Sequence, residues 1–134
     1  MHFKQITIVG TGLMGGSLGL AFKANALAGR IIGCDRDGIL TIAQKLGAID
    51  EAFTDLALAC GGSDLIVLAM PVGAIIDTLG RLPKLSAEAL VTDVGSTKRE
   101  ICETAKKVWG EGASARFLPG HPMAGKAEGG IENA

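Results

Sequence analysis

The sequence predicts an α/β fold in which helices cover both faces of a doubly wound parallel sheet. Three observations support this fold class. Short runs of β-branched and apolar residues alternate along the chain with segments of helical period. A glycine-rich turn joins the first of these runs to the first helical segment. The run Asp64–Met70 is continuously apolar, as expected of a parallel strand that is buried on both faces.

The first strand and its turn lie in Ile6–Gly15, which reads Ile-Thr-Ile-Val-Gly-Thr-Gly-Leu-Met-Gly. Gly10, Gly12 and Gly15 have the spacing G-x-G-x-x-G, and a strand before it and a helix after it are the context that a dinucleotide fingerprint requires. We expect Gly10 to make the tight turn, Gly12 to let the backbone approach a pyrophosphate, and Gly15 to let the helix pack on the strand. The free N–H groups at the start of the helix would bind the phosphates.

The second strand, Arg30–Asp35, ends in an acidic residue twenty positions after Gly15. A carboxylate at this place can accept hydrogen bonds from both hydroxyls of an adenosine ribose and would repel a 2′-phosphate, which favours NAD over NADP. Arg36 leaves NADP open, because its guanidinium could hold that phosphate. The alternative is that Asp35 only caps the next helix, although Asp37 suits that role better.

Glycines also suggest where the first two helices end. The first helix is expected from about Met14 to Ala28, with Gly29 as the residue that ends it. The second is expected over about Gly38–Leu46, again closed by a glycine at Gly47. A short third strand follows at Ala48–Phe53.

The second half of the chain continues the alternation. After the apolar strand, Pro71 leads into a helix over Val72–Leu82. The next strand is Leu90–Val94, and the turn at Gly95–Ser96 precedes another helix. Thr97-Lys98-Arg99-Glu100 fits a capping box at the start of that helix.

That helix has an apolar face, and a last strand follows it. Ile101, Ala105, Val108 and Trp109 fall on one side of the helix, which predicts that this side packs on the sheet. The final strand is expected at Ala115–Leu118.

Five features that could take part in binding or chemistry follow the ends of strands: Gly10–Gly15, Asp35, Met70–Val72, Gly95–Ser96 and His121. In doubly wound sheets, ligands lie outside the carboxyl ends of the strands, at the point where the strand order reverses. The sequence therefore predicts one site along one edge of the sheet.

Composition narrows the function classes. Length predicts one domain over residues 1–134, and 48% hydrophobic residues suit a buried α/β core. The net charge of −1 gives no reason to expect nucleic acid or an anionic membrane as a partner. The run Leu65–Ile76 is interrupted and too short to cross a bilayer, and no export signal is present, so we expect a cytoplasmic protein.

The cysteines and histidines give no sign of a disulfide framework or a metal site. Cys34, Cys60 and Cys102 are odd in number and have no C-x-x-C spacing, which favours free thiols in a reducing compartment. The two histidines lie in no cluster of possible ligands, so we expect no metal.

Three blocks resemble the prephenate and arogenate dehydrogenases of tyrosine biosynthesis, a branch of aromatic amino acid biosynthesis. They are Gly12–Ala21 (GLMGGSLGLA), Val91–Lys98 (VTDVGSTK) and Gly120–Gly125 (GHPMAG). The blocks occur in the family's order, and His-Pro-Met-Ala-Gly is far more specific than the glycine fingerprint. The resemblance implies a Rossmann domain and an oxidoreductase that passes a hydride from the hydroxyl-bearing ring carbon to NAD(P)⁺, with loss of the ring carboxylate as CO₂. The product would be 4-hydroxyphenylpyruvate from prephenate, or tyrosine from arogenate.

The resemblance also assigns catalytic roles. His121 would accept the hydrogen bond of the substrate's ring hydroxyl, and Ser96 would lie between nicotinamide and substrate, holding His121 or that hydroxyl. Asp93 and Lys98 would have supporting roles. Other readings stay open, because Ser96 could be a helix N-cap and His121 a loop residue bonded to backbone.

The resemblance places Met70, Pro71 and Val72 on the loop that lines the adenosine side of the cofactor. The expected cofactor-binding residues are Gly10, Gly12, Leu13, Met14, Gly15, Asp35, Arg36, Met70, Pro71, Val72 and Gly95, and the expected catalytic residues are His121 and Ser96.

Two features depart from the family pattern. The family commonly has a Glu two residues after the His-Pro-Met-Ala-Gly block, where this chain has Ala127 followed by Glu128. The family also continues into a helical domain, here absent after Ala134, which supplies dimer contacts and an arginine for the substrate carboxylate. We therefore expect the nucleotide-binding domain of a longer, homodimeric protein, which by itself binds NAD but turns over its small-molecule substrate poorly.

Two other functions are compatible with the fingerprint. One is another small dehydrogenase, of the β-hydroxyacid dehydrogenase or imine reductase kind, which would not call for His-Pro-Met-Ala-Gly. The other is a regulatory module that binds NAD without chemistry, which would give Ser96 and His121 no purpose.

Overall fold

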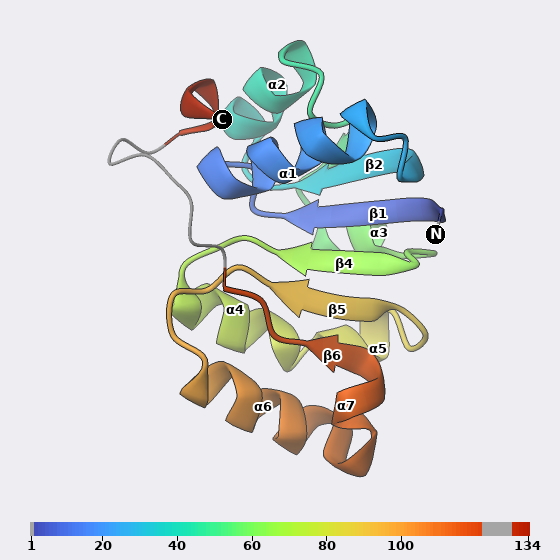
Figure 1. Cartoon of the computed structure of the whole chain (residues 1–134), viewed down its shortest axis with the longest axis vertical. Helices are drawn as coiled ribbons and strands as arrows, with labels where there is room; N and C mark the ends of the chain where they lie inside the picture. The colour runs from blue at the N-terminus through green and yellow to red at the C-terminus, as the bar shows by residue number, and fades with distance from the viewer. Residues whose placement is uncertain (1, 122–129) are drawn as a thin grey trace.

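The computed structural model describes residues 2–121 and 130–134, and within them six parallel strands form one sheet in the order β3-β2-β1-β4-β5-β6 (Figure 1). This is the strand order of a dinucleotide-binding Rossmann fold. The expected fold class is confirmed. The strands are β1 Phe3–Val9, β2 Ala28–Cys34, β3 Glu51–Phe53, β4 Leu65–Leu68, β5 Leu90–Asp93 and β6 Phe117–Leu118.

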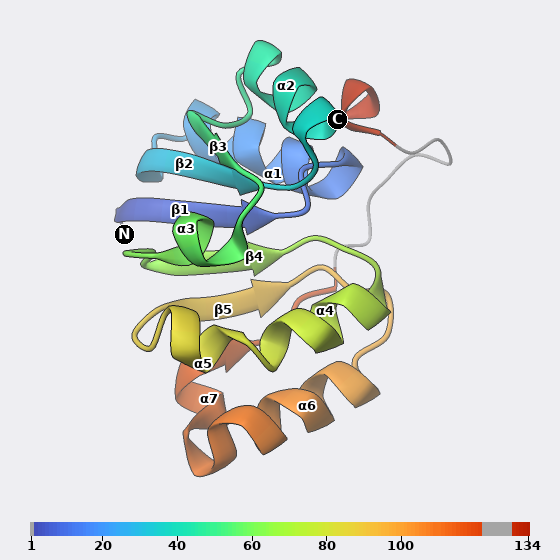
Figure 2. The same ribbon diagram turned by 180° about the vertical axis from the view of Figure 1, so that it is seen from behind.

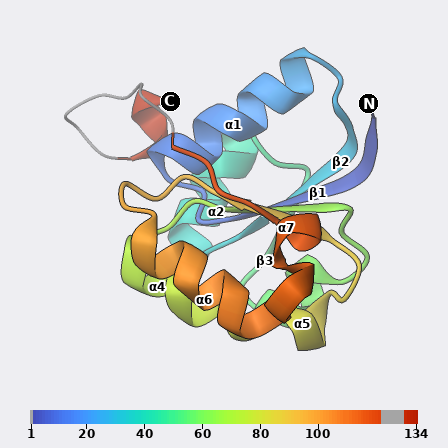
Figure 3. The same cartoon turned by 60° about the horizontal axis from the view of Figure 1, so that its bottom comes forward.

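Helices cover the two faces of the sheet in separate layers, seen from opposite sides in Figures 1 and 2. Figure 3 shows α1 on one side of the sheet and α4 and α6 on the other. The longer helices are α1 Leu13–Ala24, α2 Asp37–Lys45, α4 Val72–Leu79 and α6 Arg99–Trp109. The shorter ones are α3 Leu56–Cys60, α5 Leu82–Leu85, α7 Ala113–Arg116, and the 3₁₀ turns η1 Gly110–Gly112 and η2 Ile131–Asn133.

The alternation of side chains along β1 divides the core into two halves. Ile6 and Ile8 are buried in the cluster on the α1–α2 face, whereas Val9 belongs to the cluster packed under α3, α4 and α6. Both clusters consist almost entirely of aliphatic side chains. Burial on both faces explains why these strands appear in the sequence as nearly continuous apolar runs.

The strand register brings the carboxyl ends of the strands into one row. Val9 of β1 pairs with Cys34 of β2 on one side and with Leu68 of β4 on the other, and Leu68 pairs with Asp93 of β5. Because all these strands run in the same direction, the segments that follow them leave the sheet at the same edge. The predicted convergence of the loops is therefore present.

The first helix is shorter than predicted. It ends at Ala24, because the Asn25 side chain donates a hydrogen bond to the Ala21 carbonyl at 2.8 Å and Ala26 turns into the left-handed region with φ of 49°. The prediction that Gly29 ends this helix is wrong, since Gly29 lies inside β2.

Other boundaries also differ from the prediction. The second helix begins at Asp37, so Asp37 is its first residue rather than its cap, and its end before Gly47 (φ 76°) is as predicted. The capping box at Thr97 is wrong, because α6 begins at Arg99 with no side-chain cap.

Two short helices occupy places where the sequence predicted something else. The helix predicted over Val72–Leu82 ends at Leu79 as α4, and a separate helix, α5, begins at Leu82. Residues 113–116, of which the last two were predicted as strand, form α7. The helix α3 was not predicted. It is capped by Asp55, whose side chain accepts a hydrogen bond from the Leu58 amide. No helix in the described residues has the length and apolar character needed to cross a membrane.

Candidate functional site

The glycine turn after β1 is closely packed at two positions and open at the third. Gly10 has φ of 92°, and a side chain there would collide with the Ala69 backbone at the end of β4. A Cβ at Gly15 would collide with the Gly10 carbonyl oxygen. A Cβ at Gly12 would meet no atom within 4 Å, so this part of the turn faces open space where another molecule could approach the backbone.

The helix that begins at this turn has an uncapped N-terminus. Gly12 is its N-cap residue and has no side chain to accept a hydrogen bond, and the first turn contains no acidic residue. The amides of the first turn, at Leu13, Met14 and Gly15, thus have no side-chain acceptor from a cap. Together with the positive end of the helix dipole, these donors favour an anion beside Gly12.

A cleft of about 770 Å³ begins at the glycine turn. It contains six of the predicted cofactor-binding residues, namely Gly10, Gly12, Asp35, Arg36, Met70 and Pro71. Leu13, Met14 and Gly15 lie in the first turn of α1, Val72 begins α4, and Gly95 lies beyond β5, and none of these five lines the cleft. The remaining lining residues are Val9, Cys34, Asp37, Ile39, Thr54, Leu56, Ala69, Thr78 and Arg81.

Hydrogen bonds to the Asp35 side chain connect the end of β2 with the glycine turn. Its Oδ2 accepts a hydrogen bond from the Thr11 amide at 2.8 Å and a longer one from the Thr11 hydroxyl at 3.4 Å. Its Oδ1 accepts the Arg36 amide at 2.8 Å. The carboxylate does not cap α2, and Oδ1, which accepts one bond, still has acceptor capacity for a further donor.

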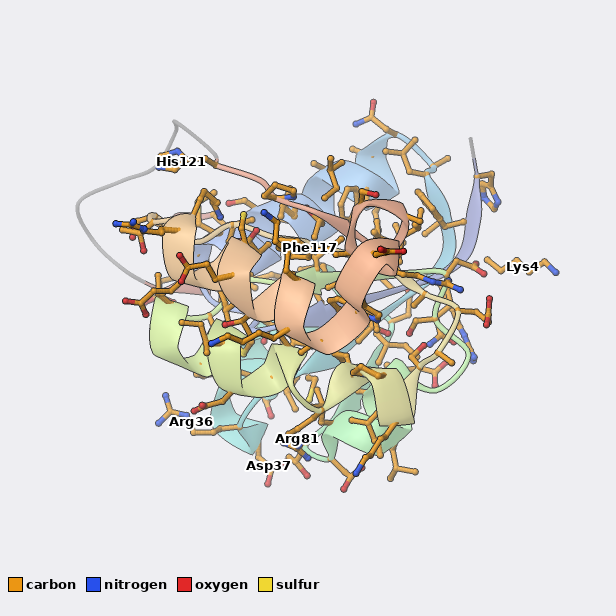
Figure 4. All side chains as sticks on the ribbon, turned by 90° about the horizontal axis from the view of Figure 1, so that it is seen from below. Lys4, Arg36, Asp37, Arg81, Phe117 and His121 are labelled. Carbon is orange, nitrogen blue, oxygen red and sulfur yellow. The ribbon has the colours of Figure 1, made fainter. Side chains whose placement is uncertain are left out.

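The cleft also contains two charged residues that the sequence did not indicate as part of it, Asp37 and Arg81. Arg81 follows α4 and lines the cleft, and it forms no ion pair with another described residue. Figure 4 shows Arg36, Asp37 and Arg81 along the same side of the molecule. No local pattern singles out Arg81, because its place in the cleft depends on how α4 packs.

Burial keeps the thiol on the cleft wall protonated. Burial and the neighbouring Asp35 carboxylate raise the pKa of Cys34 to about 11. Burial and Cys34 raise the pKa of Cys60 to about 12. Both side chains therefore act as small apolar groups near neutral pH rather than as nucleophiles.

A buried carboxylate joins the segments that follow β5 and β6. The Asp93 side chain is fully buried and accepts hydrogen bonds from the Gly95 amide at 2.8 Å and the Gly120 amide at 3.2 Å. It also forms an ion pair with Lys98, whose side chain is 25% exposed. Lys98 directly precedes α6, which begins at Arg99 without a side-chain cap.

The two predicted catalytic residues meet at this place. His121 Nε2 lies 3.0 Å from the Ser96 carbonyl oxygen. Because a carbonyl only accepts, Nε2 carries the hydrogen, and Nδ1 is the ring nitrogen that a neutral imidazole has left to accept a proton. The contact therefore uses the Ser96 backbone and not its exposed hydroxyl.

His121 lies at the same edge of the sheet as the glycine turn, since it follows β6 and the turn follows β1. In Figure 4, His121 and Arg36 lie on the left, whereas Lys4, from the amino-terminal half of β1, lies on the right. The rest of the His-Pro-Met-Ala-Gly block, together with Ala127 and Glu128, lies outside the described residues.

Within residues 2–121 and 130–134, no three His, Cys, Asp or Glu side chains gather in a way that could hold a metal ion.

Comparison with known proteins identifies relatives of the whole region. The family model described as prephenate dehydrogenase, nucleotide-binding domain, matches residues 18–134. A prephenate dehydrogenase of Lactococcus lactis is 37% identical over 130 residues, which cover 96% of this chain and 36% of that protein. The chain thus spans about a third of the length of this curated relative.

Two solved structures share the fold closely. The prephenate dehydrogenase from A. aeolicus in complex with hydroxyphenyl propionate and NAD⁺ has a TM-score of 0.86 and 31% identity, and the match covers 98% of this chain and 46% of that one. The arogenate dehydrogenase of Synechocystis has a TM-score of 0.83 and 36% identity, with coverage of 97% and 45%.

Proposed function

Since the chain belongs to the family of prephenate dehydrogenase nucleotide-binding domains, we propose that residues 1–134 form the cofactor-binding domain of an oxidoreductase that acts on prephenate or arogenate. One observation carries the proposal. The open glycine turn and the Ser96–His121 contact lie at the same edge of one parallel sheet, where a dinucleotide would pass from one to the other.

The geometry of the turn fits NAD. Gly12 leaves space for the pyrophosphate, and the uncapped amides of the first turn of α1 would donate hydrogen bonds to it. The adenosine half would extend into the cleft, between Asp35 on one wall and Met70–Pro71 on the other. When bound at this edge, the nicotinamide ring supplies a hydride acceptor.

Asp35 supports NAD rather than NADP. Its two oxygens already accept three hydrogen bonds from the chain, which hold the carboxylate in place beside the glycine turn. A ribose with two free hydroxyls can still donate to such a carboxylate, whereas a 2′-phosphate would meet a fixed negative charge.

His121 would accept the proton of the substrate's ring hydroxyl. With Nε2 donating to Ser96, the Nδ1 lone pair is free to accept the hydrogen bond of the ring hydroxyl. As the hydride leaves the hydroxyl-bearing carbon for the nicotinamide, the hydroxyl proton would pass to His121 and the oxygen would gain carbonyl character. Loss of the ring carboxylate as CO₂ would return the electron pair of the broken C–C bond to the ring and its oxygen, which takes a proton back and ends as the phenol hydroxyl of the product. Ser96 would keep the imidazole in the tautomer that this step needs.

The proposal also covers the isolated chain and a longer protein that contains it. The chain spans 36% of its L. lactis relative, so we expect the 134 residues alone to bind NAD but to turn over substrate slowly. From the family resemblance, we also propose that a longer protein carrying this domain is a homodimer.

Substrate-dependent formation of NADH tests the function. NAD⁺ is added with prephenate or with arogenate, to the chain and to a longer protein that contains it, and absorbance at the NADH band is followed. The proposal predicts NADH formation with at least one of the two acids in the longer protein, and tighter binding of NAD⁺ than of NADP⁺ to the chain. Binding of NAD⁺ without turnover of either acid by the longer protein would instead favour a regulatory module.

A further inference from the structure

We propose that Asp93, through its pair with Lys98, is the positioning residue that fixes His121 against Ser96. This inference rests on the proposed function, because the position of His121 matters for activity only if its ring meets a substrate. The physical coupling itself is independent of any ligand and can be tested in the free chain.

The Asp93 carboxylate connects two segments that are far apart in the chain. It accepts one amide from the segment after β5, at Gly95, and one from the segment after β6, at Gly120, which lies 27 residues from Asp93. The ladder between these strands ends with the pair Thr92 and Leu118. Beyond that row, the hydrogen bonds that join the two segments within the described residues are Gly120 to Asp93 and His121 to Ser96.

Both amides come from glycines that fit closely around Asp93. A Cβ at Gly95 would lie 2.9 Å from Asp93 Oδ2, and a Cβ at Gly120 would collide with the Asp93 carbonyl oxygen. Neither glycine has φ in the left-handed region, so close packing rather than backbone conformation accounts for the missing side chains, against Asp93 at Gly120 and against Asp93 and Ile101 at Gly95.

Lys98 makes this arrangement possible. A carboxylate with no exposed surface requires a cation or several donors around it. Lys98 supplies the cation at Oδ2, the oxygen that also accepts the Gly95 amide, and this leaves Oδ1 for Gly120. Because His121 follows Gly120 directly, the bond at Oδ1 sets the backbone from which the imidazole extends.

Replacement of Asp93 by Asn should remove the hydrogen bond from Gly120 while keeping the contacts with Lys98 and Gly95. The amide has the size of the carboxylate but a single acceptor oxygen, which Lys98 and the Gly95 amide would occupy. Its NH₂ group would then face the Gly120 N–H, donor against donor. We expect the Gly120 amide to exchange about tenfold faster with solvent, since it has lost its hydrogen bond.

The readout is the proton NMR signal of the histidine rings in the 134-residue chain. The sequence has two histidines, so exposed His2 is an internal reference for His121. In Asp93→Asn, we expect the ring-proton signal of His121 to move most of the way toward that of His2, while the His2 signal is unchanged. A purely structural role for Asp93 would lower the unfolding temperature and leave the His121 signal in place.

Asp50→Asn is the matched control. Asp50 also pairs with a lysine, Lys23, and accepts a backbone amide, that of Ile31, but it lies by β2 on the far side of the sheet from β6. This variant should lose stability without moving the His121 signal.

A second variant covers the case in which Asp93→Asn fails to fold. Gly120→Ala keeps the ion pair but pushes the segment after β6 away from Asp93. It should shift His121 in the same direction. A folded Asp93→Asn or Gly120→Ala chain with an unchanged His121 signal would overturn the positioning role and leave the proposed function untouched, whereas a wild-type chain that does not bind NAD⁺ would contradict only the proposed function.

Discussion

The imidazole of His121 lies 3.0 Å from the carbonyl oxygen of Ser96, although 25 residues separate them in the chain. The contact closes the gap between the segments that follow β5 and β6, at the edge of the sheet where the glycine turn also lies. Hydride transfer from an alcohol requires a proton acceptor beside the cofactor, and the proposed function gives His121 that role.

Replacement of His121 by Asn should separate chemistry from binding. In a protein with measurable turnover, kcat should fall by about 10²–10⁴-fold, because the acceptor of the hydroxyl proton is lost. The affinity for NAD⁺ should change by less than about twofold, since His121 does not line the cleft. Equal losses in kcat and in NAD⁺ affinity would show that His121 has a structural role instead.

Two glycines of the same turn should respond differently to the same change. Gly12→Ala adds a methyl group where no atom lies within 4 Å, so the free energy of unfolding should change by less than ~1 kcal/mol. The affinity for NAD⁺ should nevertheless fall about tenfold, which is ~1.4 kcal/mol, because the methyl group takes the space of the pyrophosphate.

Gly15→Ala is the companion variant. Its Cβ would collide with the Gly10 carbonyl oxygen, so we expect it to lower stability by about 1–3 kcal/mol. Thermal unfolding and calorimetric titration with NAD⁺ of both variants check the contrast. Normal NAD⁺ binding by a folded Gly12→Ala chain would contradict the proposed place of the pyrophosphate.

Most of the fold could be predicted from the sequence, because its signals are periodic and local. The alternation of apolar runs with helical segments predicted the parallel, doubly wound sheet, and the spacing of Gly10, Gly12 and Gly15 predicted the first turn. The convergence of Asp35 and His121 at one edge followed from the rule that parallel strands end on the same side.

The errors occurred where a specific side-chain contact outweighed a general preference. Gly29 resembled a helix end, but Asn25 caps the helix earlier through its own side chain. Thr97 resembled an N-cap, but α6 begins at Arg99 without a side-chain cap, and Lys98 before it pairs with the buried Asp93. Arg81 in the cleft was not predicted, since its position depends on tertiary packing.

Arg81 should contribute to cofactor affinity. Its guanidinium lines the cleft and has no ion-pair partner among the described residues, so it is available to stack on an adenine ring or to donate to it. Arg81→Gln should weaken binding of NAD⁺ by about threefold to tenfold. Lys84→Gln is the control, because Lys84 is an exposed cation on α5 that does not line the cleft. Equal effects of the two variants would point to overall charge rather than to contact.

Asp50 should give a pH-dependent part of the stability. Burial alone would raise its pKa, but the Lys23 ammonium and the Ile31 amide lower it below the ordinary value of 3.8. A group with a lowered folded-state pKa stabilises the fold above its unfolded-state pKa, and this contribution is lost as the pH falls through the folded-state pKa.

Denaturant unfolding of Asp50→Asn at several pH values checks this prediction. The variant should be less stable than the wild type by about 0.5–1 kcal/mol at pH 7. The difference should shrink as the pH is lowered past 3.8. A difference that stays constant down to about pH 2 would show that the charge of Asp50 does not contribute.

The most direct test of the central claim is a titration of the isotopically labelled chain with NAD⁺, followed by NMR. If the dinucleotide extends from the cleft along the edge of the sheet, the amides of Gly12, Leu13 and Met14 and the ring of His121 should shift together, with one binding constant. Shifts at the glycine turn without any change at Ser96 or His121, or no binding at all, would contradict the claim that cofactor and imidazole meet at this edge.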